Sequence, residues 1–313
     1  MNVFVTGASG QLGRPLVRAL VARGDRVSAL VGTDAAAELA RGDGARAVRG
    51  RLEDGSALAD GLRGCDLVVH LAGGVRGRGS VDADALNRIG TERVIDAART
   101  AGSPTIVFAS TCAVYGDRSG LWVPEDYPTS PNTAYGASKV AAENALLSSG
   151  LRVRVARIAA VFGPGFRFLQ REGMKSGTAW LPGEGRNHVP LVHVDDAVGV
   201  LLAVADRGED GRTYHVSGRS TPTLAEFYTA VHARAGGTPV RFWSTWVPSA
   251  LQFGAAALNE RLASRLGLKP RFTADNLRLF TASVRLRVER LEKELGYTWV
   301  HADHLGALDA TFS

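Results

Sequence analysis

The stretch NVFVTGASGQLG, residues 2–13, joins a short apolar run to a glycine-rich turn and the start of a helical pattern. Its glycines Gly7, Gly10 and Gly13 are spaced G-x-x-G-x-x-G at the point where strand passes into helix. Glycine permits a tight turn and lets backbone N–H groups approach a pyrophosphate, and the helix N-terminus adds partial positive charge. The stretch therefore predicts the first strand, turn and helix of a dinucleotide-binding fold.

Outward from this stretch, short apolar runs alternate with longer helical patterns. Strands are expected at 2–7, 25–31, 45–50, 66–72, 105–110 and 151–158. Helices are expected between them at about 11–23, 34–41, 56–62, 83–101 and 134–149. This repeated order is typical of an α/β protein with a Rossmann-type, doubly wound parallel sheet.

The order of elements loosens beyond residue 160. A strand is expected at 212–218, and helices near 193–206, 223–235, 247–266 and 286–295. We predict an NAD(P)-binding domain over 1–160, to which the chain returns at about 191–218, and a smaller C-terminal region, 161–313, that is mainly substrate-binding. The predicted helix 247–266 carries an apolar stripe expected to pack in the core rather than on a membrane or partner: Val247, Leu251, Leu258, Leu262 and Leu266.

The composition is that of an ordinary globular protein, with 313 residues, 45% of them hydrophobic and 22% charged. The net charge of +6 comes from dispersed arginines without interleaved aromatic residues, which argues against nucleic-acid binding. The two cysteines, Cys65 and Cys112, fit a reducing compartment. We find no secretion signal and no apolar run of about 20 residues, so a cytoplasmic protein without a membrane segment is expected.

A tyrosine and a lysine lie one helical turn apart in NTAYGASKVAAEN, residues 132–144. Tyr135 and Lys139 should face the same way, because residues four apart share a helix face. A phenol has a pKa near 10, and a neighbouring ammonium with a positively charged nicotinamide would lower it into a working range. The preceding strand ends in hydroxyls at Ser110 and Thr111, which can bind a substrate oxygen while the phenol moves the proton.

The end of the second predicted strand bears on the choice of cofactor. An acidic residue there would hold the ribose hydroxyls of NAD, whereas an arginine would attract the 2′-phosphate of NADP. The chain has Val31 and Gly32 at this tip, followed by Thr33 and Asp34. The choice between NAD and NADP stays open, although Arg51 after the third strand and the positive net charge favour NADP.

Several motifs together resemble the extended branch of the short-chain dehydrogenase/reductase family. They are TGASGQLG (6–13), DLVVHLAG (66–73), FASTCAVYG (108–116), YGASK (135–139), RIAAVFGPG (157–165), VPLVHVDDAV (189–198) and YHVSG (214–218). The resemblance implies that Tyr135 is the acid/base, that Lys139 lowers its pKa and holds the nicotinamide ribose, and that Thr111 orients the reacting oxygen, with Ser110 as a second candidate. It also implies a homodimer through the helices near 83–101 and 134–149. The implied cofactor-binding residues are Gly7, Ser9, Gly10, Gln11, Leu12, Gly13, Val31, Gly32, Arg51, Leu52, Leu71, Ala72, Gly73, Tyr135, Lys139, Ile158 and Val161.

Departures from the family pattern bear on the substrate. Sugar-nucleotide dehydratases of the family carry Asp-Glu after the catalytic Thr, whereas this chain has Cys112 and Ala113. Ala160 and Val189 replace an Asn and an Arg that hold the nucleotide diphosphate in many epimerases, and Arg51 stands where an Asp commonly contacts the adenine. The pattern resembles the 3β-hydroxysteroid dehydrogenase and ketone reductase side of the branch more closely. The aromatic residues available to line an apolar substrate pocket are Phe166, Trp180, Phe242, Trp243 and Trp246.

The expected function is an NAD(P)-dependent oxidoreductase that interconverts a secondary alcohol and a ketone on a small-molecule substrate. The alternatives are a sugar-nucleotide epimerase with tightly bound NAD, and a cofactor-sensing regulator without catalysis. No metal site is expected, because the histidines and carboxylates show no ligand spacing. His301 and His304 are expected to be a solvated pair, and Asp195 and Asp196 a helix-start feature.

Overall fold

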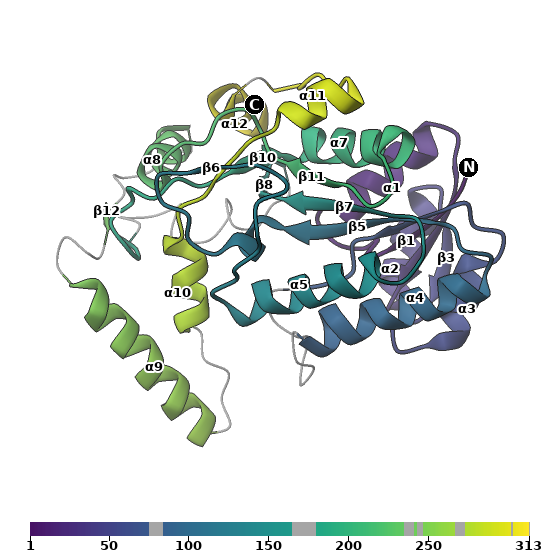
Figure 1. Ribbon diagram of the computed structural model, residues 1–313, viewed down its shortest axis with the longest axis horizontal. Helices are drawn as coiled ribbons and strands as arrows, with labels where there is room; N and C mark the ends of the chain where they lie inside the picture. The colour runs from purple at the N-terminus through teal and green to yellow at the C-terminus, as the bar shows by residue number, and fades with distance from the viewer. Residues whose placement is uncertain are drawn as a thin grey trace.

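The computed structural model describes residues 1–74, 84–164, 180–234, 241–242, 247–266, 273–301 and 303–312. Its main sheet has seven strands in the order β11-β7-β5-β4-β1-β2-β3, and every pairing is parallel (Figure 1). The strands of this sheet are β1 (Asn2–Thr6), β2 (Arg26–Val31), β3 (Arg46–Arg49), β4 (Leu67–His70), β5 (Thr105–Thr111), β7 (Val153–Ile158) and β11 (Thr213–Val216). From β1 the chain adds β2 and β3 on one side of the sheet and then β4, β5, β7 and β11 on the other. Doubly wound sheets bind ligands at this reversal of strand order.

The central strands are buried on both faces, which explains their nearly continuous apolar sequences. Val3 of β1 lies opposite Val27 of β2 and Leu67 of β4, and all three side chains are at most 4% exposed. A strand covered on both sides has no solvent face for polar residues, so its pattern does not alternate.

Helices cover both faces of the sheet (Figure 1). One face is covered by α1 (Gly13–Ala22), α2 (Asp34–Gly42), α7 (Val194–Arg207) and α11 (Glu289–Leu295). The other face is covered by α3 (Gly55–Leu62), α4 (Gly90–Thr100) and α5 (Ala134–Leu147). This arrangement confirms the predicted α/β class and the Rossmann-type doubly wound sheet.

The remaining elements form small layers beside the main sheet. The short strands pair two by two: β6 (Trp122–Val123) with β13 (Arg285–Leu286), β8 (Ala160–Phe162) with β10 (Leu191–His193), and β9 (Trp180–Leu181) with β12 (Arg241–Phe242). They are accompanied by α8 (Leu224–Arg234), α9 (Ser249–Arg265), α10 (Ala274–Thr281) and α12 (His304–Phe312). Residues of β8, β10, α8 and α12 share a small apolar core of their own. The division into two domains near residue 160 stays a prediction.

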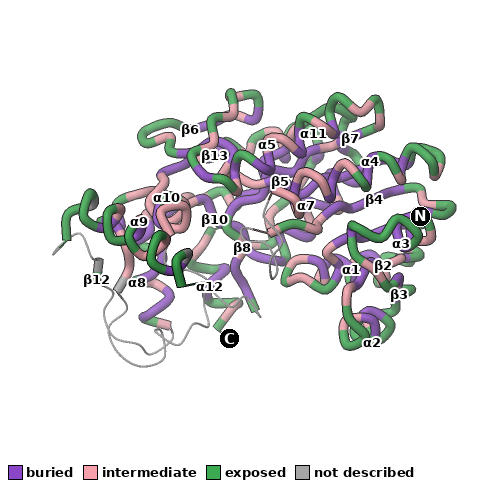
Figure 2. The backbone as a smooth tube through the Cα atoms, turned by 90° about the horizontal axis from the view of Figure 1, so that it is seen from below, coloured by how far each residue is buried: buried purple, intermediate pink, exposed green. Residues whose placement is uncertain are grey.

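The apolar stripe predicted over 247–266, most of which lies in α9, is not buried. The five stripe residues are 38–69% exposed, so the prediction that they pack in the core is wrong (Figure 2): Val247, Leu251, Leu258, Leu262 and Leu266. The helix instead buries Gln252, Ala256 and Ala263. The amide of Gln252 explains this choice of face, because it accepts from the backbone N–H of Gly183 at 3.2 Å and donates to the carbonyl of Val247 at 2.8 Å.

Among the helices of the described residues, none combines the length and the apolar character that are needed to cross a bilayer.

Candidate active site

The glycine-rich turn brings three backbone segments into contact at the carboxyl end of β1. Gly7 has a φ of 70°, and a Cβ at this position would lie 2.7 Å from the backbone nitrogen of Ala72, just after β4. A Cβ on Gly13 would lie 2.1 Å from the carbonyl oxygen of Gly7. Both positions therefore require glycine, since any side chain would collide with backbone that cannot move aside.

The turn leads into a helix end that is suited to an anion. In α1, which the structure describes in full, the first turn holds no acidic side chain and Leu12 at the N-cap makes no side-chain cap. The first N–H groups of a helix have no partners within the helix, and the helix dipole adds positive charge there. This end of α1 can therefore accept a pyrophosphate.

The other predicted cofactor-binding residues lie along the same carboxyl edge of the sheets, where doubly wound folds bind nucleotides. Val31 ends β2, Ile158 ends β7, and Val161 lies in the neighbouring strand β8. The rest follow strands directly: Ser9, Gly10 and Gln11 after β1, Gly32 after β2, Arg51 and Leu52 after β3, and Leu71, Ala72 and Gly73 after β4.

Helix α5 carries Tyr135 and Lys139, and its start is fixed by a cap. Thr133 is the N-cap, and its hydroxyl accepts from the backbone N–H of Gly136 at 3.0 Å. Lys139 is buried, with its Nζ 4.2 Å from the centre of the Phe108 ring. A Cβ on Gly73 would lie 3.4 Å from the same Nζ, so the lysine reaches the segment that follows β4.

The hydroxyls of Thr111 and Tyr135 meet at the start of α5. Burial raises the pKa of Tyr135 to about 12, and the hydrogen bond from Thr111 opposes that shift. Lys139 is not among the groups that shift the pKa of this phenol. The prediction that the ammonium acidifies Tyr135 is therefore not supported for the protein alone, in which the phenol stays protonated near neutral pH.

Lys139 itself has a strongly altered acidity. Burial lowers its pKa from 10.5 to about 7, and the nearby carboxylate of Glu143 opposes the shift. A lysine in a low-dielectric site is easier to deprotonate because its charged form loses hydration.

We expect the free energy of unfolding to rise between pH 7 and about pH 8.5 as a result of this shift. In that interval the unfolded chain binds more protons than the folded one. Lys139 loses its proton in the folded protein, where its pKa is about 7, but keeps it in the unfolded chain, where the ordinary pKa is 10.5. Urea unfolding across this range should show a flatter dependence on pH for Lys139→Met. The range ends below pH 9 because burial raises the pKa of both Cys65 and Cys112 to about 11. At higher pH these thiols ionise in the unfolded chain before they do so in the folded protein, which lowers the free energy of unfolding. Equal slopes for the two proteins would contradict this account.

The structure separates Ser110 from the hydroxyl pair. Neighbouring residues of a strand point to opposite faces, and the Ser110 hydroxyl donates to the carboxylate of Glu143 in the interior. Glu143 in turn forms a buried ion pair with Arg157, with Nη2 2.7 Å from Oε2 and Nε 3.1 Å from Oε1. Of the two candidates, Thr111 is the one placed beside Tyr135.

Asn87 belongs to the same cluster and was missed by sequence reasoning. It lies in the π-helical turn η1 (Ala85–Ile89) and is 1% exposed. Its side chain bonds both backbone groups of Gly74 at 3.0 Å and donates to the Ser138 hydroxyl at 2.9 Å. Ser138 donates to the carbonyl of Tyr135 at 2.8 Å, so Asn87 connects the segment after β4 with the helix of the tyrosine. The sequence contained one signal for Asn87, its spacing: it lies four residues before Thr91 and seven before Val94, and so on the same helix face. The structure buries all three residues.

The buried histidines of the main sheet have partners that account for them. His70 Nδ1 lies 2.6 Å from the Thr6 hydroxyl, and its Nε2 lies 3.0 Å from the Thr91 hydroxyl. Burial and the charge of Lys139 lower the pKa of His70 to about 3. His215 is likewise buried, 2.5 Å from the Tyr115 hydroxyl and 2.8 Å from the carbonyl of Arg287.

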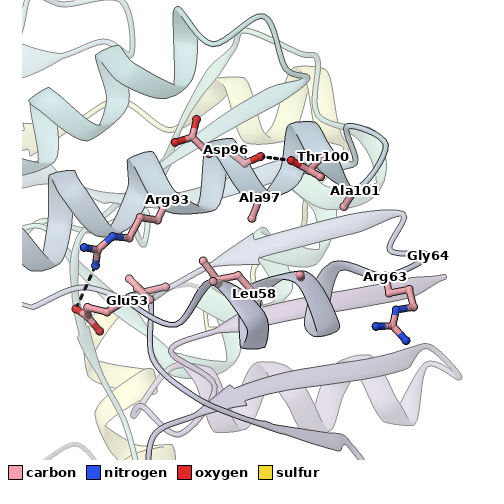
Figure 3. Close-up of a pocket in the computed structure, with 12 residues that line it drawn as sticks. Glu53, Leu58, Arg63, Gly64, Arg93, Asp96, Ala97, Thr100 and Ala101 are labelled. Atoms are coloured by element: carbon pink, nitrogen blue, oxygen red, sulfur yellow. Dashed lines mark hydrogen bonds and ion pairs between the residues drawn. The ribbon is translucent and has the colours of Figure 1, made fainter.

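A surface groove of about 640 Å³ runs between α3 and α4, away from this cluster (Figure 3). Arg93 and Glu53 face each other across it at 3.9 Å, and Leu58 and Ala97 line its apolar part. Of the predicted site residues, Leu52 alone is among those that line it. Phe166, Trp243 and Trp246 lie outside the described residues, as do the side chains of Trp180 and Phe242, so the predicted aromatic lining is not tested.

Known proteins resemble this chain in sequence and in fold. The model of the NAD dependent epimerase/dehydratase family matches residues 3–217. A ketoreductase from Stigmatella aurantiaca, named for 4-hydroxy-2-methyl-3-oxo-4-farnesyl-3,4-dihydroquinoline-1-oxide, is 33% identical over 99% of this chain and 95% of its own. A dTDP-glucose 4,6-dehydratase from Streptomyces griseus is 35% identical over 75% of this chain and 79% of its own. A crystal structure of a double mutant of DesIV, the dTDP-glucose 4,6-dehydratase of Streptomyces venezuelae, with NAD and DAU bound, has a TM-score of 0.78 at 26% identity and covers 100% of this chain and 96% of its own.

Proposed function

Because this chain belongs to the NAD-dependent epimerase/dehydratase family, an extended group of short-chain dehydrogenases/reductases, we propose that it interconverts a ketone and a secondary alcohol. The observation that carries the proposal is the meeting of the Thr111 and Tyr135 hydroxyls one helical turn from the buried Lys139. A bound nicotinamide supplies or accepts the hydride.

In the reducing direction, Tyr135 is the proposed proton donor. A phenol whose pKa is about 12 is protonated near neutral pH and can give its proton to the oxygen of the carbonyl that is being reduced. In this proposal Thr111 holds the same oxygen and Lys139 holds the nicotinamide ribose. Asn87 fixes the start of α5 against the segment after β4, so that these groups keep their positions.

An apolar ketone is the proposed substrate class. Cys112 and Ala113 follow Thr111, so the chain lacks the Asp-Glu pair that dehydratases of the family use to remove water. Ala160 and Val189 stand where many epimerases place an Asn and an Arg for the nucleotide diphosphate. The Stigmatella relative, named as a ketoreductase of a farnesylated quinoline, supports a large apolar substrate.

The absorbance of reduced nicotinamide at 340 nm tests this function. The purified protein is expected to consume NADH or NADPH when offered apolar ketones, with a net loss of absorbance. An epimerase would purify with NAD bound and convert UDP-sugars without net change, and a cofactor-sensing regulator would bind the nucleotide and convert neither. Either of these results would replace the proposed function.

For the cofactor, we propose that Arg51 favours NADPH over NADH. The Arg51 side chain passes within 3.8 Å of the place where a Cβ of Gly32 would lie, at the tip of β2. An arginine there can hold the 2′-phosphate, whereas an acidic residue would repel it. We expect Arg51→Ala to weaken NADPH binding by about tenfold or more, since a charge-assisted contact contributes roughly 1.5–3 kcal/mol.

Titration calorimetry with both nucleotides provides the check on Arg51. Binding of NADH should change little in Arg51→Ala. Arg46→Ala is the matched control, because Arg46 lies at the opposite end of β3 and is paired with Asp60 at 2.8 Å. An equal loss for both nucleotides would contradict the proposed role.

The homodimer through α4 and α5 also stays a proposal, supported by the family resemblance.

A further inference from the structure

Helix α9 presents a row of large apolar side chains to solvent at one end of the molecule (Figure 1). Leu251, Leu258 and Leu262 are 63%, 57% and 49% exposed, and Leu266, directly after the helix, is 69% exposed. Their spacings of seven, four and four residues place them on one side of the helix. We call these four residues the leucine face. Single exposed leucines are common on soluble proteins, whereas a contiguous apolar patch marks an interaction surface.

The opposite side of α9 is held by the rest of the protein, so the leucine face cannot turn inward. Ala256 is fully buried there, and the buried amide of Gln252 accepts from the backbone N–H of Gly183. The carboxylate of Glu260 accepts from the backbone N–H of Ala274, at the start of α10, at 2.7 Å. A rotation of the helix that buried the leucines would break both of these bonds. The outward direction of the leucine face is therefore fixed by the packing of α9.

Two arginines border the leucine face. Arg261 and Arg265 lie three and seven residues after Leu258, and both are exposed. Neither has an acidic partner among the residues that the structure describes. Glu260 is the one acidic residue of α9, and it is engaged with α10. The leucine face and its border therefore combine apolar surface with positive charge that no carboxylate of the helix neutralises.

This charge decides between a second copy of the chain and a lipid surface as the occupant of the leucine face. A second copy would offer the same face, which holds no carboxylate to pair with Arg261 and Arg265. The headgroups of an anionic bilayer supply phosphates for both arginines. Arginine side chains lie along apolar surface and keep the guanidinium at the water boundary, which is the depth of these headgroups. The net charge of +6 favours approach to the same surface.

We propose that the leucine face of α9 docks on the surface of an anionic lipid bilayer. Amphipathic helices that bind in this way lie in the plane of the interface, with their apolar side about 5–10 Å deep. The leucines enter the boundary of the acyl chains, and Arg261 and Arg265 stay among the headgroups. An apolar ketone, the substrate class proposed above, dissolves in the same bilayer, so docking brings the protein to its substrate. The docking itself does not depend on that activity.

The test is co-sedimentation of the full chain with vesicles at low salt, without cofactor or ketone. We expect the chain to bind vesicles of phosphatidylglycerol and phosphatidylcholine about tenfold or more tightly than vesicles of phosphatidylcholine alone. Leu258→Ser/Leu262→Ser should weaken binding to the mixed vesicles by at least about tenfold, because both positions lose apolar surface that the lipid would cover. Arg261→Gln/Arg265→Gln should remove most of the preference for the anionic lipid and of the sensitivity to salt.

Leu39→Ser/Leu305→Ser is the matched control for the leucine variant. These leucines are 46% and 45% exposed, but they belong to α2 and α12, which lie apart from α9 (Figure 1). The control should bind the mixed vesicles as the wild type does. The Tm of each variant shows whether it is folded, and we expect little change, since substitutions of exposed side chains seldom alter stability much.

Three results would overturn the proposal: no binding of the wild-type chain to the mixed vesicles, undiminished binding by both α9 variants, or an equal loss in the control. Sedimentation velocity without lipid tests the other occupant. If the leucine variant dissociated a dimer and still bound vesicles, the face would belong to a second copy and the proposal would be wrong. Because vesicle binding is measured without cofactor or ketone, its failure is distinct from a failure of the proposed reductase activity.

Discussion

Tyr135→Phe is expected to lower kcat by about 10²- to 10⁴-fold, the usual contribution of a positioned acid or base. The variant loses the hydroxyl that meets Thr111, while its ring still fills the same space at the start of α5. Cofactor binding should change little, because the glycine-rich turn and Lys139 remain. The rate is measured from the absorbance at 340 nm with a ketone that the wild-type protein reduces.

A second tyrosine provides the control for this result. Tyr127 packs its ring against the Arg118 guanidinium, 5.7 Å from the ring centre, and edge-on against Tyr115, with ring centres 6.4 Å apart. Tyr127→Phe should therefore keep kcat within about twofold of the wild type, as expected for a substitution away from the chemistry. A folded Tyr135→Phe protein that binds cofactor and retains most of its turnover would refute the assignment of Tyr135 as the proton donor.

Arg157→Met is expected to lower the free energy of unfolding by about 3–5 kcal/mol, the typical cost of leaving one buried charge without its partner. The side chains of Arg157 and Glu143 are 8% and 3% exposed and make two parallel contacts. Arg157 also donates to the Tyr115 hydroxyl at 2.7 Å and to the carbonyl of Glu125 at 3.2 Å. Urea unfolding followed by circular dichroism gives the difference directly.

The double variant Glu143→Gln/Arg157→Met isolates the contribution of the unpaired charge. It loses the same Arg157 contacts but also removes the carboxylate of Glu143, and the carbonyl oxygen of the new amide can still accept from Ser110. We expect the double variant to be more stable than Arg157→Met alone, with a coupling of about 1–3 kcal/mol in the double-mutant cycle. If the two variants were equally unstable, or the single variant lost less than about 1 kcal/mol, the buried pair would not have the role given to it.

The main sheet was predictable because its sequence signal is local. Each central strand is covered on both faces, so it reads as an apolar run of a few residues between turns. The helices between these strands bury one face each, so their apolar residues recur every three or four positions along the sequence. Helices α10 and α12 were not predicted. They lie outside the alternation of strands and helices in the main sheet, and they bury only Leu277, and Ala307 with Leu308, so they show little apolar periodicity.

The candidate site was predictable only where family motifs mark it. Tyr135, Lys139 and the glycine turn carry such motifs, whereas Asn87 is identified by its burial and its bonds to Gly74 and Ser138. The choice of Thr111 over Ser110 depends on which face of β5 each hydroxyl takes, and the sequence leaves that open. Ser110 points to Glu143 in the body of α5, whereas Thr111 points the other way and lies beside Tyr135. The position of His301 was predicted wrongly: it is half of a contact with Asp195 across 106 positions, not part of a solvated pair with His304.

The edge strand β11 has a consequence for how the chain folds as it leaves the ribosome. β7 pairs with β5 on one side, but its other side stays open until Thr213–Val216 has been synthesised. A nascent chain that ends earlier exposes the free backbone groups of β7, which invite pairing with another chain. Arg154 places positive charge within that strand until its partner Asp210 has been made, and this charge opposes aggregation during the delay. Completion of the main sheet thus waits for a segment that is made only after helix α7.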